Sequence, residues 1–149
     1  MVTIKQIADF LETGPVAVAG VSRNPKKFGY TAFKELKEKG LNVIPVNPEA
    51  DEILGIKAYN RISDLPPDVK SLLVLTKKDK TEKVVKEALE KGINNIWIQQ
   101  MSDSKPALNE LEGKNVNLIT GECILMHYKP HSIHKFHRLL RKIFGSLPK

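Results

Sequence analysis

The chain has 149 residues, of which 41% are hydrophobic and 28% are charged, proportions typical of one globular domain. A single cysteine, Cys123, excludes an internal disulfide and a zinc site built on paired cysteines, which fits a reducing compartment. Lys5, Asp9 and Glu12 interrupt the first segment, and no apolar run is long enough to span a membrane, so we expect a cytoplasmic protein.

The formal net charge is +7, and the excess lies mostly at the C-terminal end, where no acidic residue follows Glu122. A positive chain favours anionic partners, which include nucleotides, nucleic acids and acidic proteins. Composition alone does not choose among these partners.

The first third of the chain predicts two helices and two strands. Thr3 followed by Gln6 indicates a capping box at the start of a helix that ends before Gly14. The apolar run 16–20 lies between breakers and predicts a buried strand, and a loop then leads to a helix near 29–40.

A second strand is expected at 43–46, where Pro45 is awkward because proline cannot donate a ladder hydrogen bond. We therefore expect Pro45 near the strand end or facing away from a neighbour. The next segment is less regular, with a short strand near 56–59 and a helical turn near 62–65.

The alternation of strand and helix continues to the C-terminus. Asp79 and Glu82 resemble a capping pair for a helix that Gly92 ends. The other expected elements are strands at 72–75, 96–98 and 116–119, a short helix at 106–111, and an amphipathic helix at 131–144.

Apolar strands that alternate with helices predict an α/β fold, with a doubly wound parallel sheet of about five strands covered by helices on both faces. Neither a linker nor an internal repeat divides the chain, so we expect one domain over 1–149. Residues 129–149 are interpreted as its basic helical extension.

In such a sheet, ligands bind beyond the carboxyl ends of the strands, where strand order reverses. The exit loop of the first strand, 20–30, combines a turn-forming Gly20, the hydroxyl of Ser22 and the start of a helix at Gly29, whose free N–H groups attract phosphate. Three cationic residues accompany them: Arg23, Lys26 and Lys27. A plain surface loop with solvated lysines is the alternative, but the convergence of these groups favours a phosphate site.

A dinucleotide site of the usual kind is disfavoured, because the glycines are not spaced as G-x-G-x-x-G. The second strand also ends in Val46-Asn47-Pro48 with no acid at its tip, and Glu49 and Asp51 lie past the turn. The P-loop pattern is absent as well.

Several motifs together resemble the small CoA-binding domain proteins, stand-alone relatives of the nucleotide-binding domain of succinyl-CoA synthetase α subunits. The resemblance covers roughly residues 3–128. The motifs, which match in order and spacing, are Gly20-x-Ser22-x-x-Pro25-x-Lys27-x-Gly29-Tyr30, Val46-Asn47-Pro48, Leu75-Thr76, Ile96-Trp97-Ile98-Gln99 and Gly121-Glu122-Cys123.

This resemblance implies a Rossmann-like fold with coenzyme A as the cofactor, laid across the strand ends. By position, the loop motif with Gly20, Gly29 and Tyr30 would receive the ligand. The implied contacts are Ser22, Arg23 and Lys27 with the phosphates, Val46, Asn47 and Pro48 with the nucleotide, Thr76 and Lys77 with the adenosine, and Gln99 and Gln100 with the pantetheine arm. Gly121-Glu122 stands where the family usually has Asp-Arg, so a family-wide role of the cysteine region does not carry over to this chain. The phosphohistidine domain of the synthetase is also missing, so we do not expect acyl-CoA synthesis by this chain alone.

The leading interpretation is a protein that binds CoA or acyl-CoA without evident catalytic machinery. The alternatives are an enzyme that uses NAD or processes CoA thioesters, and a nucleic-acid-associated protein acting through its basic C-terminal helix. We favour the first, and expect that helix to pack on the body or on a second subunit in a homodimer.

Four histidines near the C-terminus invite a metal interpretation, but no carboxylate accompanies them in the sequence and basic residues surround them. A solvated basic helix face is therefore favoured, and no metal is expected. The histidines are His127, His131, His134 and His137. Cys123 is interpreted as a small buried hydrophobic residue.

Overall fold

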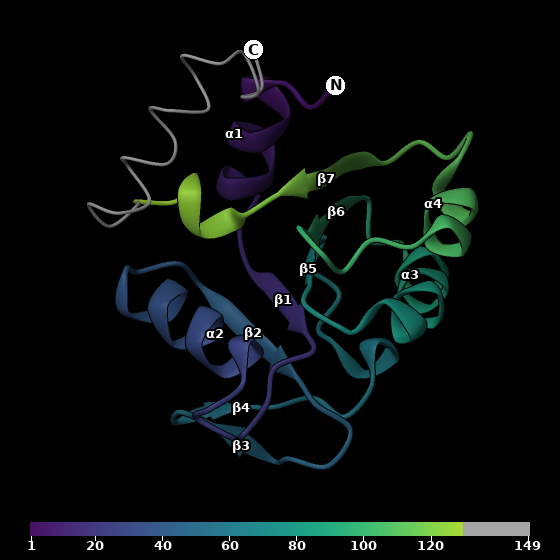
Figure 1. Cartoon of the computed structure of the whole chain (residues 1–149). Helices are drawn as coiled ribbons and strands as arrows, with labels where there is room; N and C mark the ends of the chain where they lie inside the picture. The colour runs from purple at the N-terminus through teal and green to yellow at the C-terminus, as the bar shows by residue number, and fades with distance from the viewer. Residues whose placement is uncertain (130–149) are drawn as a thin grey trace.

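Five parallel strands form the centre of the molecule in the computed structural model, which describes residues 1–129 (Figure 1). Their order across the sheet is β2-β1-β5-β6-β7. The predicted doubly wound α/β fold is confirmed. The strands are β1 (Val16–Ala19), β2 (Val43–Val46), β5 (Ser71–Val74), β6 (Asn95–Gln99) and β7 (Asn117–Glu122).

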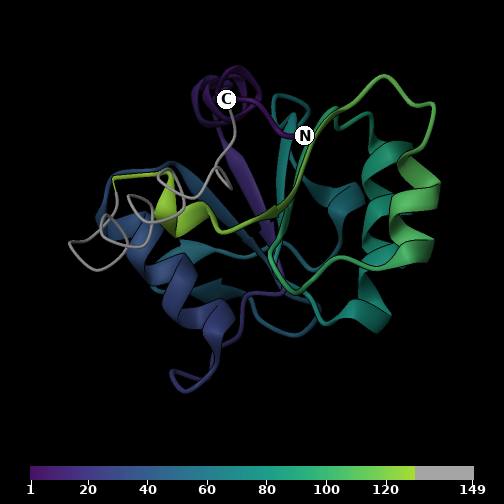
Figure 2. The ribbon, with the colours of Figure 1, turned by 45° about the horizontal axis from the view of Figure 1, so that its top comes forward.

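Helices cover both faces of the sheet (Figure 2). One face packs against α1 (Ile4–Glu12) and α2 (Phe28–Glu38), and the opposite face packs against α3 (Lys78–Lys91) and α4 (Lys105–Leu111). Within residues 1–129, none of these helices has the length and apolar character needed to cross a membrane.

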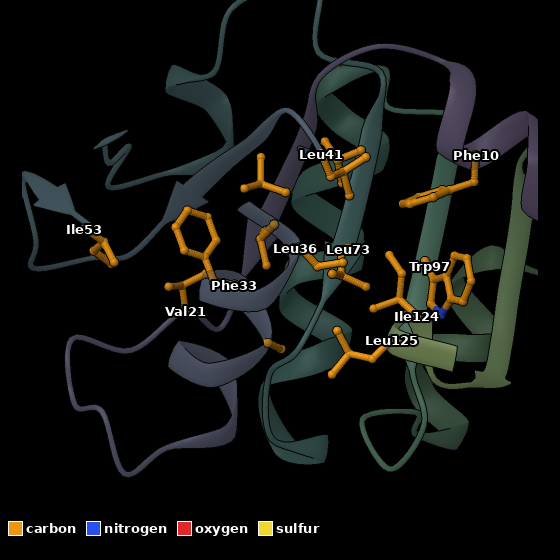
Figure 3. Close-up of a cluster of buried hydrophobic side chains, with 14 of the residues drawn as sticks. Phe10, Val21, Phe33, Leu36, Leu41, Ile53, Leu73, Trp97, Ile124 and Leu125 are labelled. Atoms are coloured by element: carbon orange, nitrogen blue, oxygen red, sulfur yellow. The ribbon is translucent and has the colours of Figure 1, made fainter. Parts of the chain in front are cut away.

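The sheet divides the core into two hydrophobic layers. Val18, Leu73, Trp97 and Ile119 occupy adjacent register positions and pack under α1 and α2 (Figure 3). The residues next to them in each strand point to the opposite face, because successive side chains alternate. Burial on both faces explains why the strands are continuous apolar runs.

Shorter elements complete the fold. A two-residue hairpin, β3 (Glu52–Ile53) and β4 (Ile56–Lys57), follows β2, and Tyr59 then makes an isolated parallel bridge to Val46. The expected short strand near 56–59 is therefore only partly formed. Two 3-10 turns, η1 (Ile62–Asp64) and η2 (Ile124–Met126), precede β5 and follow β7.

Pro45 lies on β2, which is an edge strand. Its carbonyl accepts a hydrogen bond from the Tyr59 N–H at 3.0 Å, so its backbone faces outward, away from β1. The expectation that Pro45 faces away from its strand neighbour is confirmed, because this position needs no donor toward the sheet.

Two boundaries differ from expectation. The N-cap of α3 is Lys77, and Asp79 lies inside the first helical turn, so the expected Asp79–Glu82 cap is wrong. The last strand continues to Glu122, well past 119, with a register shift opposite Ile98 and Gln99 and a φ of +76° at Gly121. The expected helix at 131–144 lies outside the described residues.

Candidate functional site

The strand order reverses at β1, which lies between β2 and β5. The chain leaves β1 toward α2 on one face and leaves β5 toward α3 on the other. The exit loops 20–27 and 75–77 therefore diverge at the carboxyl edge of the sheet, which is the position where open α/β sheets bind ligands.

A pair of glycines fixes the start of α2 beside these loops. Gly20 has a φ of +90°, and a Cβ there would lie 2.6 Å from the Leu75 carbonyl carbon. A Cβ on Gly29 would lie 2.2 Å from the Gly20 carbonyl oxygen. Gly29 is thus required because the backbone of Gly20 packs against it.

The loop after β1 is folded by its own side chains. Ser22 Oγ accepts a hydrogen bond from the Asn24 N–H at 3.0 Å, and Asn24 Oδ1 accepts one from the Lys26 N–H at 3.0 Å. Because Ser22 acts here as an acceptor, its hydroxyl proton is still available for an anion. Such local turns order the loop before any ligand arrives.

The helices that follow β1 and β5 have no side-chain cap at their N-terminus. Lys27 is the N-cap of α2 and Lys77 is the N-cap of α3, and neither side chain caps its helix. In contrast, Thr3 caps α1 and Ser104 caps α4. The first N–H groups of α2 and α3 have no intrahelical acceptor, so both starts can attract an anion that a lysine also favours.

The carboxyl edge carries a positive surface with one loose ion pair. Arg23 Nη2 lies 3.4 Å from Glu49 Oε2, with side chains 59% and 79% exposed. Further lysines are exposed and form no salt bridge within residues 1–129; they are Lys26, Lys27, Lys77, Lys78 and Lys80. An anion at this edge would therefore meet exposed cations that no described carboxylate neutralises.

Asn47 joins the exit loops of β1 and β2. Its Nδ2 donates to the Val21 carbonyl at 2.9 Å, and its Oδ1 accepts from the N–H groups of Glu49 and Ala50 at 2.8 and 3.0 Å. The structure therefore gives this side chain protein partners on both ends. Beside it, Val46 is buried and Pro48 is exposed, while Tyr30 is half-buried on α2.

The exit loops of β5 and β6 are also tied together. Thr76 Oγ1 lies 2.8 Å from Thr81 Oγ1, and the fully buried Thr81 donates to the Ser102 carbonyl at 2.7 Å. Gln99 is buried and its Oε1 accepts from the Ile124 N–H at 3.1 Å, whereas Gln100 is exposed. The Gln99 side chain thus holds η2 against the end of β6.

The family model described as the CoA binding domain matches residues 15–129. The chain belongs to the CoA-binding domain family. This family match confirms the resemblance drawn from the sequence motifs, and it covers every strand of the sheet.

Similar proteins include both short chains and large ligases. The CoA-binding domain is 37% identical over 90 residues to the acetate–CoA ligase [ADP-forming] II subunit alpha of Pyrococcus furiosus, a match that covers 60% of this chain and 20% of that one. It therefore spans about a fifth of that subunit. The uncharacterized protein YneT of Bacillus subtilis is 29% identical, with 73% and 81% of the two chains covered.

A solved structure shares the fold. A conserved hypothetical protein from Pyrococcus furiosus superposes with a TM-score of 0.73 at 36% identity, covering 76% of this chain and 98% of its own. The match thus spans nearly the full length of that neighbouring chain.

A buried acid–base pair in the CoA-binding domain was missed by the sequence interpretation. Glu122 Oε2 lies 3.0 Å from His127 Nε2, and their side chains are 9% and 4% exposed. The statement that no carboxylate accompanies the histidines is therefore wrong for His127. The other three histidines lie outside the described residues, and within 1–129 no three ligating side chains form a metal cluster.

Trp97 supports this pair from the core. Its Nε1 donates to the Glu122 carbonyl at 3.0 Å, and its ring packs against Phe10 and His127 with centroids 5.3 and 5.8 Å apart. In the sequence, Glu122 and His127 are only five residues apart on either side of the end of β7. That spacing alone does not predict a buried pair.

Proposed function

We propose that this protein binds coenzyme A or an acyl-CoA at the carboxyl edge of the sheet, with the ligand phosphates at residues 20–30. The membership of the CoA-binding domain family supports the ligand. The observation that carries the location is the convergence of two uncapped helix starts, each with a lysine at its N-cap, at the point where strand order reverses.

We assign a ligand contact to each side chain from the hydrogen-bond donors and charges it has to offer. Ser22, Arg23 and Lys27 contact the phosphates, because they offer a hydroxyl proton and two cations at the start of α2. Thr76 and Lys77 lie under the adenosine. The residues that line or shape the remaining site are Gly20, Gly29, Tyr30, Val46, Asn47, Pro48 and Gln99.

Asn47 and Gln99 act as positioning residues in this proposal. Both ends of the Asn47 amide are already hydrogen-bonded to Val21, Glu49 and Ala50, and Gln99 Oε1 is hydrogen-bonded to Ile124. A ligand that took these bonds would leave backbone groups without partners, which is costly for the buried Ile124 N–H and the partly buried Val21 carbonyl. Both residues therefore serve by holding the exit loops in place.

We propose binding without catalysis, in a single domain over 1–149 that acts in the cytoplasm. The Glu122–His127 pair is enclosed, so it is poorly placed to exchange protons with a ligand. A CoA-thioester-processing enzyme is the second candidate, because similar segments occur in acetate–CoA ligases.

Isothermal titration with CoA and with 3′-dephospho-CoA tests the proposal. We expect micromolar binding of CoA, weakened by added salt because phosphate contacts are screened. Absence of any heat or thermal shift with CoA and acetyl-CoA would contradict it. A thioester hydrolysis assay on the same samples separates binding from catalysis, and turnover would favour the second candidate.

A further inference from the structure

Met101 is a large apolar residue held out into solvent at the end of β6. Met101 is one of four large hydrophobic residues that are exposed among residues 1–129, and it is 74% exposed. Its φ is +77°, a backbone conformation that L residues with a side chain rarely adopt.

The conformation at Met101 is imposed by a tight turn. The Ser102 N–H donates to the Gln99 carbonyl at 2.8 Å, so Met101 is the third residue of a four-residue turn. A positive φ at that position normally selects glycine or asparagine. The chain instead has a methionine there, whose long thioether side chain projects into solvent and is available for a contact.

Hydrogen bonds tie this turn to the exit loop of β5, which packs against Gly20 at the start of the proposed phosphate loop. The Ser102 carbonyl accepts from Thr81 on α3, and Thr81 in turn lies 2.8 Å from Thr76 at the end of β5. β6 is two strands away from β1, which corresponds to roughly 10 Å at the usual strand spacing. The extended pantetheine arm of CoA is longer than this distance.

The turn at 100–102 differs in charge from the loops on the β2 side of the carboxyl edge. On the β2 side, the loops carry Arg23 and Glu49 as an exposed ion pair. On the β6 side, residues 100–102 are uncharged, with Gln100 and Met101 both exposed. Lys77, Lys78 and Lys80 lie nearby at the start of α3, so within the turn itself Met101 supplies an apolar contact that the acyl end of an acyl-CoA could use.

We infer that Met101 contacts the acyl group of a bound acyl-CoA, so that the protein prefers apolar acyl-CoA thioesters to free CoA. This inference rests on the proposed function. A flexible thioether can adapt to alkyl chains of different shape. Each added methylene that loses contact with water strengthens binding, whereas the carboxylate of a succinyl group finds no partner at Met101.

Titration calorimetry with CoA, acetyl-CoA, hexanoyl-CoA and succinyl-CoA tests the inference. For the wild type we expect hexanoyl-CoA to bind about fivefold more tightly than CoA, and succinyl-CoA no more tightly than CoA. Met101→Ala should remove the hexanoyl preference and leave the CoA affinity within about twofold. Ile4→Ala, which truncates an exposed apolar residue on α1, is the matched control and should retain the preference.

Met101→Gly separates binding from folding, because glycine tolerates the positive φ. We expect its melting temperature to equal or exceed that of the wild type while the hexanoyl preference is lost. Equal affinities for CoA and hexanoyl-CoA in the wild type, or a preference that survives in both Met101 variants, would overturn the inference while CoA binding stands. Failure of all four compounds to bind would overturn the proposed function, and this inference with it.

Discussion

Asn47 Nδ2 donates a hydrogen bond to the carbonyl oxygen of Val21 over 2.9 Å, which joins two loops whose residues are 26 positions apart. The same side chain accepts from the N–H groups of Glu49 and Ala50. One amide thus determines how the loops after β1 and β2 lie relative to each other at the candidate site.

Asn47→Ala should lower the free energy of unfolding by about 1–3 kcal/mol, because it leaves partly buried backbone groups without partners. Asn47→Asp keeps the acceptor for Glu49 and Ala50 but loses the donor to Val21, so it isolates the link between the loops. Denaturant unfolding and CoA titration of both variants measure these effects. Wild-type stability and affinity in Asn47→Ala would show that the link is dispensable.

Gly29→Ala should destabilise the fold by more than about 2 kcal/mol, because its Cβ would meet the Gly20 carbonyl oxygen at 2.2 Å. Gly113→Ala is the control, since Gly113 has a φ of +72° but open space around it. That control should cost only about 1 kcal/mol of backbone strain. Thermal melts compare the two variants, and equal losses would contradict the close approach of α2 to β1.

Lys27→Glu should weaken CoA binding by about tenfold or more, because it places a negative charge at the proposed phosphate position. Lys83→Glu makes the same change in net charge on the exposed side of α3 and should leave affinity nearly unchanged. Titration at two salt concentrations checks the mechanism. Similar losses in both variants would indicate an effect of net charge rather than a phosphate contact at Lys27.

Glu49→Gln should strengthen CoA binding by about two- to fivefold, since it frees Arg23 from an exposed ion pair of small energy. Its stability should stay within about 0.5 kcal/mol of the wild type, because both side chains are largely solvated. Calorimetry measures the affinity. Weaker binding would mean that Glu49 itself contacts the ligand.

The layered fold could be predicted from sequence because both faces of the sheet are buried. Continuous apolar runs such as 72–75 have few other stable uses in a chain of this length, and Gly20 marks the sharp turn after β1. Thr3 was recognised because a capping box depends on residues three apart. These features are local, so short stretches of sequence reveal them.

Side chains whose partners lie far away in the sequence could not be predicted in the same way. Asn47 and Gln99 have residue types that suit a ligand, but their partners lie on loops brought near only by the sheet. The pair of Glu122 and His127 likewise depends on the path of η2 after β7. Asp79 was interpreted as a cap because acidic residues are common at the N-cap. The helix instead begins two residues earlier, with Lys77 as its N-cap.

Pro45 has a consequence for how copies of this protein meet. An incoming strand needs alternating donors and acceptors along an exposed edge, but Pro45 has no N–H and its carbonyl is already bonded to Tyr59. The Asn47 N–H beyond it is bonded to the Tyr59 carbonyl as well. The outer margin of β2 from Pro45 onward is therefore closed to intermolecular sheet extension, which hinders fibre-like growth of a hydrophobic sheet on that side.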